Sequence, residues 1–188
     1  MGASSQARRH PWLEQDATLG FMAPTSASRS GSLADQFEAA VANFSRVVES
    51  LTSEQWRIRG RNTPGMRIND EDEARPLGVI AHHVAVNLSV IMGRIQAAVR
   101  EQASPPLDFK QINARHANEY ADTTKAQVLS LLHDNGQQIA KDLRSIPDEK
   151  LDISQELPSG KMSVQQRIER VLIGHIQGHQ GSIEATIA

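Results

Sequence analysis

The stretch 170-RVLIGHIQGHQGSIEATI-187 carries two histidines, His175 and His179, four residues apart in apolar surroundings. Residues i and i+4 lie on the same face of an α-helix. This face is continued by three aliphatic side chains, Ile168, Leu172 and Ile183. Both imidazoles therefore point toward the place where a core is expected. A buried imidazole needs a partner for its ring nitrogens, and one metal ion would serve both histidines.

The HxxxH pattern is short and has many accidental matches, so a pair of hydrogen-bonded core histidines is the alternative interpretation. Position 176 is Ile, which disfavours a zinc protease because the Glu of HExxH is missing. No Glu is followed by a His three residues later, which excludes a di-iron carboxylate bundle. Gly174, Gly178 and Gly181 flank the pair and indicate either close helix or subunit contact or space for a ligand beside a metal.

The composition excludes several classes of function. The chain has 188 residues and a net charge of −2, so nucleic-acid binding has no electrostatic support. Cysteine is absent, so a metal must take nitrogen and oxygen ligands, and thiol chemistry needs a thiol from a cosubstrate. We see no apolar run that approaches the roughly 18 residues of a bilayer span, and no apolar leader at the N-terminus. We therefore expect a cytoplasmic protein that does not interact with membranes.

Two regions differ in pattern. Residues 1–31 are rich in Ser, Ala and Arg and show no helical period, which predicts a flexible or loosely docked N-terminal arm. Residues 32–188 show helical periodicity in long segments and no useful strand-like alternation. This pattern predicts an all-α four-helix bundle domain.

Capping residues and prolines set the expected helix limits. The first helix is expected to follow Ser32 as its N-cap, and the second to open at Pro76 and stop before the prolines 105–106. A shorter helix is expected over residues 109–121. Capping boxes at Thr124 and Ser163, each with Gln three residues later, mark the starts of the third and fourth long helices.

A catalytic metal site usually has three protein ligands and one open position, so a third ligand is expected. His82 and His83 lie about 100° apart on a helix, so only one faces the core squarely. His83 shares the larger apolar stripe, with Val79 and Val86 beside it, and is the favoured ligand. His82 is then expected to pack against a neighbour or reach solvent. Two further histidines are expected to play no part in metal binding. His116 lies on the polar short helix and is expected to be exposed, and His133 lies off the main apolar face.

The chain resembles the DinB/YfiT-like superfamily of bacterial metal-binding four-helix bundles over residues 32–188. The stretches that carry the resemblance are LTSEQW at 51–56, PLGVIAHHV at 76–84 and HIQGHQGSI at 175–183. The resemblance implies an up-down-down-up bundle, in which a histidine of the second helix and the HxxxH of the fourth hold a divalent metal. Matched to this chain, the ligands are His83, His175 and His179. The metal is expected to be Zn, Ni, Fe or Mn, because imidazole suits several transition metals.

The resemblance also implies a thiol-dependent transferase that activates a low-molecular-weight thiol and acts on a small-molecule substrate. A metal-dependent hydrolase and a non-catalytic, stress-associated metal-binding bundle are the alternatives. Candidates for a general base are Glu184, nine residues past His175, and Asn87, one turn past His83. The apolar second helix and the small residues of the fourth predict a homodimer.

Overall fold

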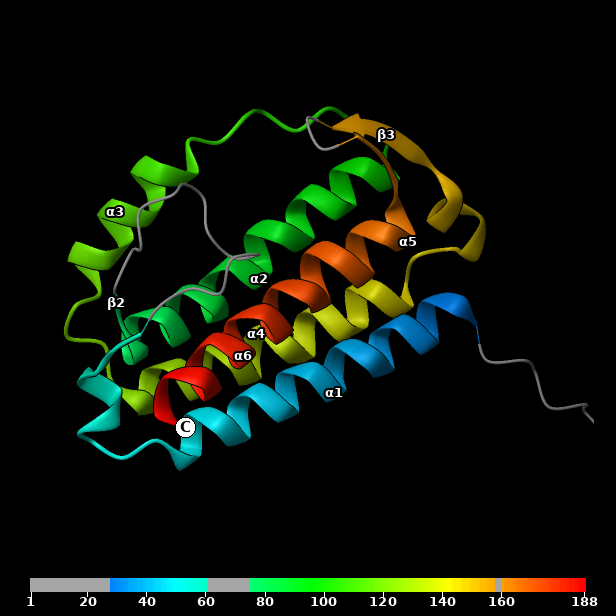
Figure 1. Cartoon of the computed structure of the whole chain (residues 1–188). Helices are drawn as coiled ribbons and strands as arrows, with labels where there is room; N and C mark the ends of the chain where they lie inside the picture. The colour runs from blue at the N-terminus through cyan, green and yellow to red at the C-terminus, as the bar shows by residue number, and fades with distance from the viewer. Residues whose placement is uncertain (1–27, 61–74, 158–159) are drawn as a thin grey trace, which may run out of the picture.

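The structure is a computed structural model that describes residues 28–60, 75–157 and 160–188. Four long helical rods dominate it, and the predicted all-α four-helix bundle is confirmed (Figure 1). The rods are α1 (Arg29–Ser50), α2 (Leu77–Val99), α4 (Lys125–Arg144) and a last rod made of α5 (Val164–Arg167), the π-helix η4 (Ile168–Ile173) and α6 (Gly174–Ile187).

The four rods pack around one core. Both α1 and α2 pack against α4 and against α6. In Figure 1, α1 and the last rod run from right to left, whereas α2 and α4 run from left to right, which is the order up, down, down, up. Each rod contributes fully buried side chains to the core, among them Phe37, Phe44, Leu88, Leu132 and Leu172. The apolar faces predicted from helical periodicity thus meet at the centre of the bundle.

The expectation that no apolar run is long enough to cross a membrane is wrong for α2. By length and composition, Leu77–Val99 is the one helix in the described part of the chain that meets these requirements. However, 61% of its most apolar window is buried inside the bundle. A helix that packs on neighbours over most of its surface needs the same composition, so the core position explains it.

Short elements connect the rods. A short helix, α3 (Phe109–Glu119), confirms the prediction for residues 109–121. Two antiparallel pairs were not predicted from the sequence: β1 (Arg59–Gly60) with β2 (Arg75–Pro76), and β3 (Ser154–Leu157) with β4 (Gly160–Ser163). Their side chains are mostly exposed or half-buried, so they leave no apolar alternation to read. The 3-10 turns η1 (Gln55–Arg57) and η3 (Asp148–Asp152) complete the described elements.

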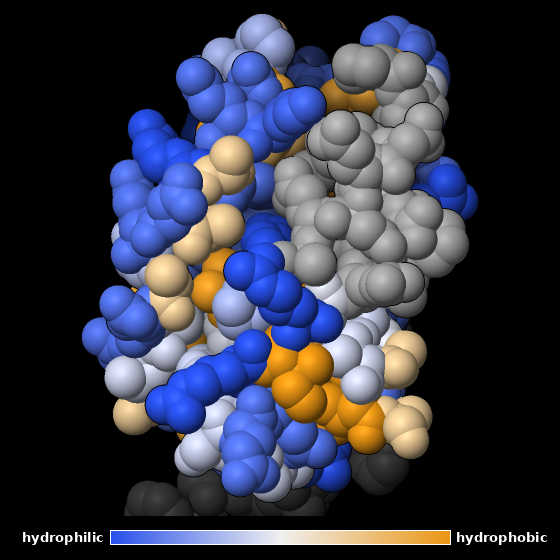
Figure 2. Space-filling model, turned by 60° about the vertical axis from the view of Figure 1, so that its left-hand side comes forward, coloured by the Kyte–Doolittle hydropathy of each residue, from blue (hydrophilic) through white to orange (hydrophobic). Residues whose placement is uncertain are grey.

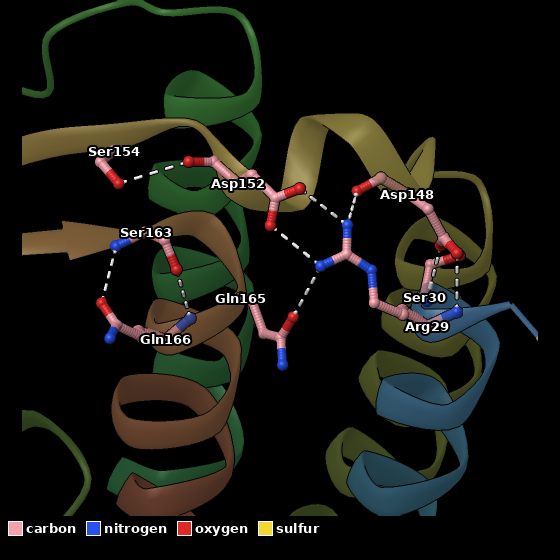
Figure 3. Close-up of polar contacts among 8 residues, drawn as sticks. All are labelled: Arg29, Ser30, Asp148, Asp152, Ser154, Ser163, Gln165 and Gln166. Atoms are coloured by element: carbon pink, nitrogen blue, oxygen red, sulfur yellow. Dashed lines mark hydrogen bonds and ion pairs between the residues drawn. The ribbon is translucent and has the colours of Figure 1, made fainter.

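The first helix begins earlier than predicted. Its N-cap is Ser28, not Ser32, and the Ser28 side chain accepts a hydrogen bond from Gly31 N at 3.0 Å. Arg29 forms a two-pronged ion pair with Asp152 of η3 (Figure 3), and its backbone N–H donates to Asp148 at 2.9 Å. These partners lie more than 100 residues away in sequence and stabilise the extra turn. Residues 28–31 therefore belong to the bundle, and the rest of the predicted arm lies outside the described residues.

Both predicted capping boxes are confirmed. At α4, the Thr124 side chain bonds to Gln127 N while the Gln127 side chain accepts from Thr124 N. At α5, Ser163 and Gln166 form the same reciprocal pair (Figure 3). The second box fixes where the last rod begins, and hence which residues of that rod face α2.

Candidate metal centre

Three histidines from two helices converge where α2 packs on α6. The ligand nitrogens of His83 on α2 and of His175 and His179 on α6 all lie within 4.8 Å of one another. The ring centroid of His83 is 5.3 Å from that of His175 and 5.1 Å from that of His179. The ring centroids of His175 and His179 are 4.6 Å apart. The structure thus brings together the three residues chosen from the sequence, with His83 rather than His82 in the cluster.

Burial keeps these imidazoles neutral. His83 and His179 are 6% and 3% exposed, and His175 is half-buried. Burial lowers the pKa of His175 to about 4 and the pKa of His179 to about 3, with smaller contributions from neighbouring positive charge. The pKa of His83 is also lowered, first by burial and then by the other two histidines and Arg75. Near neutral pH all three rings therefore carry the lone pairs that a metal ion requires.

Two ring nitrogens of the cluster lack a partner. Nε2 of His175 and Nδ1 of His179 are buried and accept or donate no hydrogen bond in the described part of the chain. An unpaired buried polar group costs about 1–3 kcal/mol, so such groups normally have a reason. A divalent ion bound by all three rings would remove this cost. The donor set, three neutral imidazoles with no thiolate, fits a divalent transition metal.

Asn87 holds the third imidazole from the side. Its Nδ2 lies 2.9 Å from Nδ1 of His83 and donates to the backbone carbonyl of His83 at 3.0 Å. The Asn87 amide therefore lies against the ring of His83, and its Nδ2 is also 3.2 Å from Nε2 of that ring. Of the two candidates for a general base, Asn87 therefore lies at the centre. Glu184 is exposed, accepts a hydrogen bond from Gln180 at 2.8 Å and does not line the cavity beside the cluster.

His116 contradicts its prediction. It was expected to be exposed, but it is 8% exposed and its Nε2 lies 2.8 Å from Nδ1 of His82. The ring of Tyr120 stacks on His82 at 4.1 Å. His82 therefore packs against neighbours on α3 and points away from the metal cluster, which is one of the two outcomes expected for it. His133 is exposed, contacts Gln137 and lies outside the histidine cluster.

A cavity of about 370 Å³ opens beside the three histidines. Its walls are largely aliphatic and aromatic side chains of α2, α3 and η4. The amides Asn87 and Asn113 also line it, together with three arginines that sequence reasoning missed: Arg75, Arg94 and Arg167. In the sequence these arginines look like ordinary surface charges, and only the helical register of Arg167, three residues after Val164 and four before Val171, places it near an apolar face.

The π-helix η4 was also missed. It immediately precedes α6 and widens the helix just before His175. Single π turns are frequent at functional sites because they change the direction in which later side chains point. The sequence has no local residue pattern that distinguishes such a turn from α-helix.

Comparisons with known proteins agree with the four-helix bundle fold. The chain matches the family model of the DinB superfamily over residues 36–183. It is similar to the solved structure of YfiT from Bacillus subtilis, described as a probable metal-dependent hydrolase with an unusual four-helix bundle topology, with a TM-score of 0.65, 17% identity and coverage of 88% of this chain and 91% of that one. It is also similar to DfsB, described as a sibling lethal factor precursor, with a TM-score of 0.55, 15% identity and coverage of 86% and 95%. No curated protein matches the chain.

Likeness at these identities shows the fold alone, whereas the family model covers most of the chain. The protein belongs to the DinB superfamily.

Proposed function

We propose that this protein is a metal-dependent enzyme that binds one divalent transition metal through His83, His175 and His179. The observation that supports this most directly is the convergence of three buried, neutral imidazoles, two of them with an unpartnered ring nitrogen, on the wall of a cavity. Core histidines retained only for packing are expected to have hydrogen-bond partners. The cavity gives a substrate access to the cluster.

When bound, a divalent ion supplies Lewis acidity and lowers the pKa of a water or thiol beside it. The three histidines hold the ion without neutralising its charge, and Asn87 orients His83. The apolar walls exclude water and hold an organic substrate. Among the described residues that line the cavity none is a carboxylate.

Thiol transfer is the reaction that asks least of a base at the described cavity wall. A thiol has an ordinary pKa of about 8.5, whereas that of water is about 15.7, so a thiol needs far less help to become a nucleophile. We propose that a low-molecular-weight thiol is activated at the cluster and adds to an electrophilic small molecule. Metal-dependent hydrolysis is the second candidate, and the likeness to YfiT, described as a probable metal-dependent hydrolase, supports it.

Elemental analysis of untagged protein, purified without added metal, tests the proposal. About one divalent ion per chain is expected in the wild type and essentially none in the double variant His175→Ala/His179→Ala. The matched control is His133→Ala, because His133 is exposed and outside the cluster. A wild-type protein that carries no metal, and takes up none of Zn, Ni, Mn or Fe, would contradict the proposal.

Activity assays then separate the two reactions. Thiol transfer is supported if the protein consumes free thiol in the presence of an electrophile. This consumption should require metal and be lost in the double variant. Metal-dependent cleavage of esters or amides without added thiol supports hydrolysis instead. The homodimer and the cytoplasmic location stay predictions, and light scattering of the purified protein tests the first.

A further inference from the structure

Two arginines that line the cavity have no carboxylate partner among the residues that the structure describes. Arg167, at the end of α5, is only 6% exposed; its Nη2 donates to the neutral Gln155 at 3.0 Å, and its Nε is buried with no hydrogen-bond partner among the described residues. Arg94 on α2 donates from Nη1 to the carbonyl of Pro105 at 2.8 Å. Neither forms an ion pair within the described parts of the chain, and no Asp or Glu described there lines the cavity.

A buried guanidinium without a counter-charge is unfavourable. Arg94 and Arg167 line the same cavity. Burial lowers the pKa of Arg167, and the positive charge of Arg94 lowers it further. Gln155 satisfies one N–H but compensates no charge. The planar, multi-donor guanidinium is the side chain best suited to recognise carboxylate and phosphate groups. An anionic ligand would therefore supply the counter-charge that the arginines lack among the described residues.

Hydrophobic side chains form a large part of the cavity wall between the arginines and the histidines. Three large hydrophobic residues that line it are unusually exposed, Val90 at 47%, Phe109 at 51% and Val171 at 39%. Ile91 and Ile95 extend the same surface along α2. On the side of the molecule that Figure 2 brings forward, hydrophobic residues lie directly beside strongly hydrophilic ones. A ligand that fits such walls has an apolar body in addition to its charged group.

The arginines and histidines lie at different heights along the same two rods. On α2, His83 and Arg94 are 11 residues apart, which is about 16 Å along the helix axis. On the last rod, Arg167 and His175 are 8 residues apart, with the π-helix η4 between them. The long arginine side chains shorten the separation between the guanidinium groups and the imidazoles. A ligand body several carbon atoms long would span what remains.

We propose that Arg94 and Arg167 bind the anionic group of an organic carboxylate or phosphate monoester, whose apolar body lies along the cavity and brings its far end to the histidine cluster. This inference rests on the proposed function and specifies its substrate class: an amphipathic organic anion, held by its charge at one end and exposed to chemistry at the other. Arg75 also lines the cavity and has further interactions of its own.

Three probes with the same apolar chain test the proposal: octanoate, octyl phosphate and 1-octanol. Their dissociation constants can be measured by chemical-shift titration of isotope-labelled protein. At least one of the two anions is expected to bind about tenfold or more tightly than the alcohol, because only the anions form charge-assisted hydrogen bonds with the arginines. The comparison of octanoate with octyl phosphate shows which anionic group the arginines prefer.

Variants show whether the arginines cause the preference. Arg167→Met and Arg94→Met keep much of the side-chain volume and are expected to reduce the preference for the anion about tenfold. Arg46→Met is the matched control, because Arg46 lies on α1, outside the cavity, and its side chain contacts Asn43. Circular dichroism checks folding, and half-buried Arg94 provides the test if Arg167→Met does not fold.

Metal analysis keeps this proposal separate from the previous one. Arg167→Met is expected to retain the metal content of the wild type, and the His175→Ala/His179→Ala variant is expected to retain the preference for the anion. Equal binding of the anions and the alcohol, or a preference that survives in both arginine variants, would overturn the inference. A preference lost in the histidine variant would also overturn it, since the anion would then bind at the histidine cluster.

Discussion

Replacing Gly78 by alanine tests the contact that fixes the start of α2, the helix that carries His83. A Cβ added at Gly78 would lie 2.3 Å from Cε2 and 2.4 Å from Nε1 of the Trp56 indole. The ring has little freedom to move, because Nε1 donates to the carbonyl of Thr123 at 2.9 Å and the indole packs against the core. Gly78→Ala therefore has to displace the indole and break its hydrogen bond.

The expected loss follows from three contributions. Overpacking costs about 1–3 kcal/mol, and a lost hydrogen bond costs about 0.5–1.5 kcal/mol. The better helix propensity of alanine returns up to about 1 kcal/mol. The net expectation for Gly78→Ala is a fall of about 0.5–4.5 kcal/mol in the free energy of unfolding.

Gly93→Ala is the matched control on the same helix, because an added Cβ there meets nothing within 4 Å. It should gain about 0.5–1 kcal/mol through helix propensity alone. Urea denaturation followed by far-ultraviolet circular dichroism measures both values by linear extrapolation. If Gly78→Ala proves as stable as Gly93→Ala, the indole is not held against Gly78 and the reasoning about this contact is wrong.

Two further predictions concern stability. In metal-free protein, the free energy of unfolding should fall as the pH drops from about 6.5 toward 4, because the pKa of His116 and that of His175 are about 4 in the folded state and about 6.5 when unfolded. Protonation of each of these histidines lowers the free energy of unfolding by at most about 1.4 kcal/mol per pH unit between pH 6.5 and 4, and has no effect at higher pH. A urea midpoint that is unchanged or higher at pH 5 than at pH 7 would contradict this. Ser163→Ala removes the cap on Gln166 N, 3.1 Å away, and should cost about 1 kcal/mol. Exposed Ser154→Ala should change the same urea midpoint little, and equal effects would argue against the cap.

The features that the sequence predicted are those with local causes. Helical periodicity and two reciprocal capping boxes depend on residues three or four positions apart, so α4 and the last rod begin where expected. The HxxxH spacing of His175 and His179 is equally local. His83 was chosen over His82 because the apolar stripe on α2 is itself a local pattern, and its ring does lie beside the other two.

The features that the sequence did not predict depend on which segments meet in space. His116 is buried because its ring packs beside His82 and His83 of α2, although α3 is largely polar along its own length. Likewise, α1 starts at Arg29 because Asp148 and Asp152 come close to it from η3 (Figure 3). Neither contact leaves a pattern within a short window of residues.

The arginines are the clearest case of this limit, and they also explain how the site is built. Arg94 and Arg167 come from different helices, and their role follows only from burial and from the lack of a nearby carboxylate in the described structure. The histidine cluster and the arginine pair nevertheless share the same supports, since α2 packs on α5, η4 and α6 alike. One helix interface therefore fixes both ends of the cavity. Sites held on packed helices keep their geometry better than sites held on loops, so the distance between the proposed anion site and the histidine cluster should vary little.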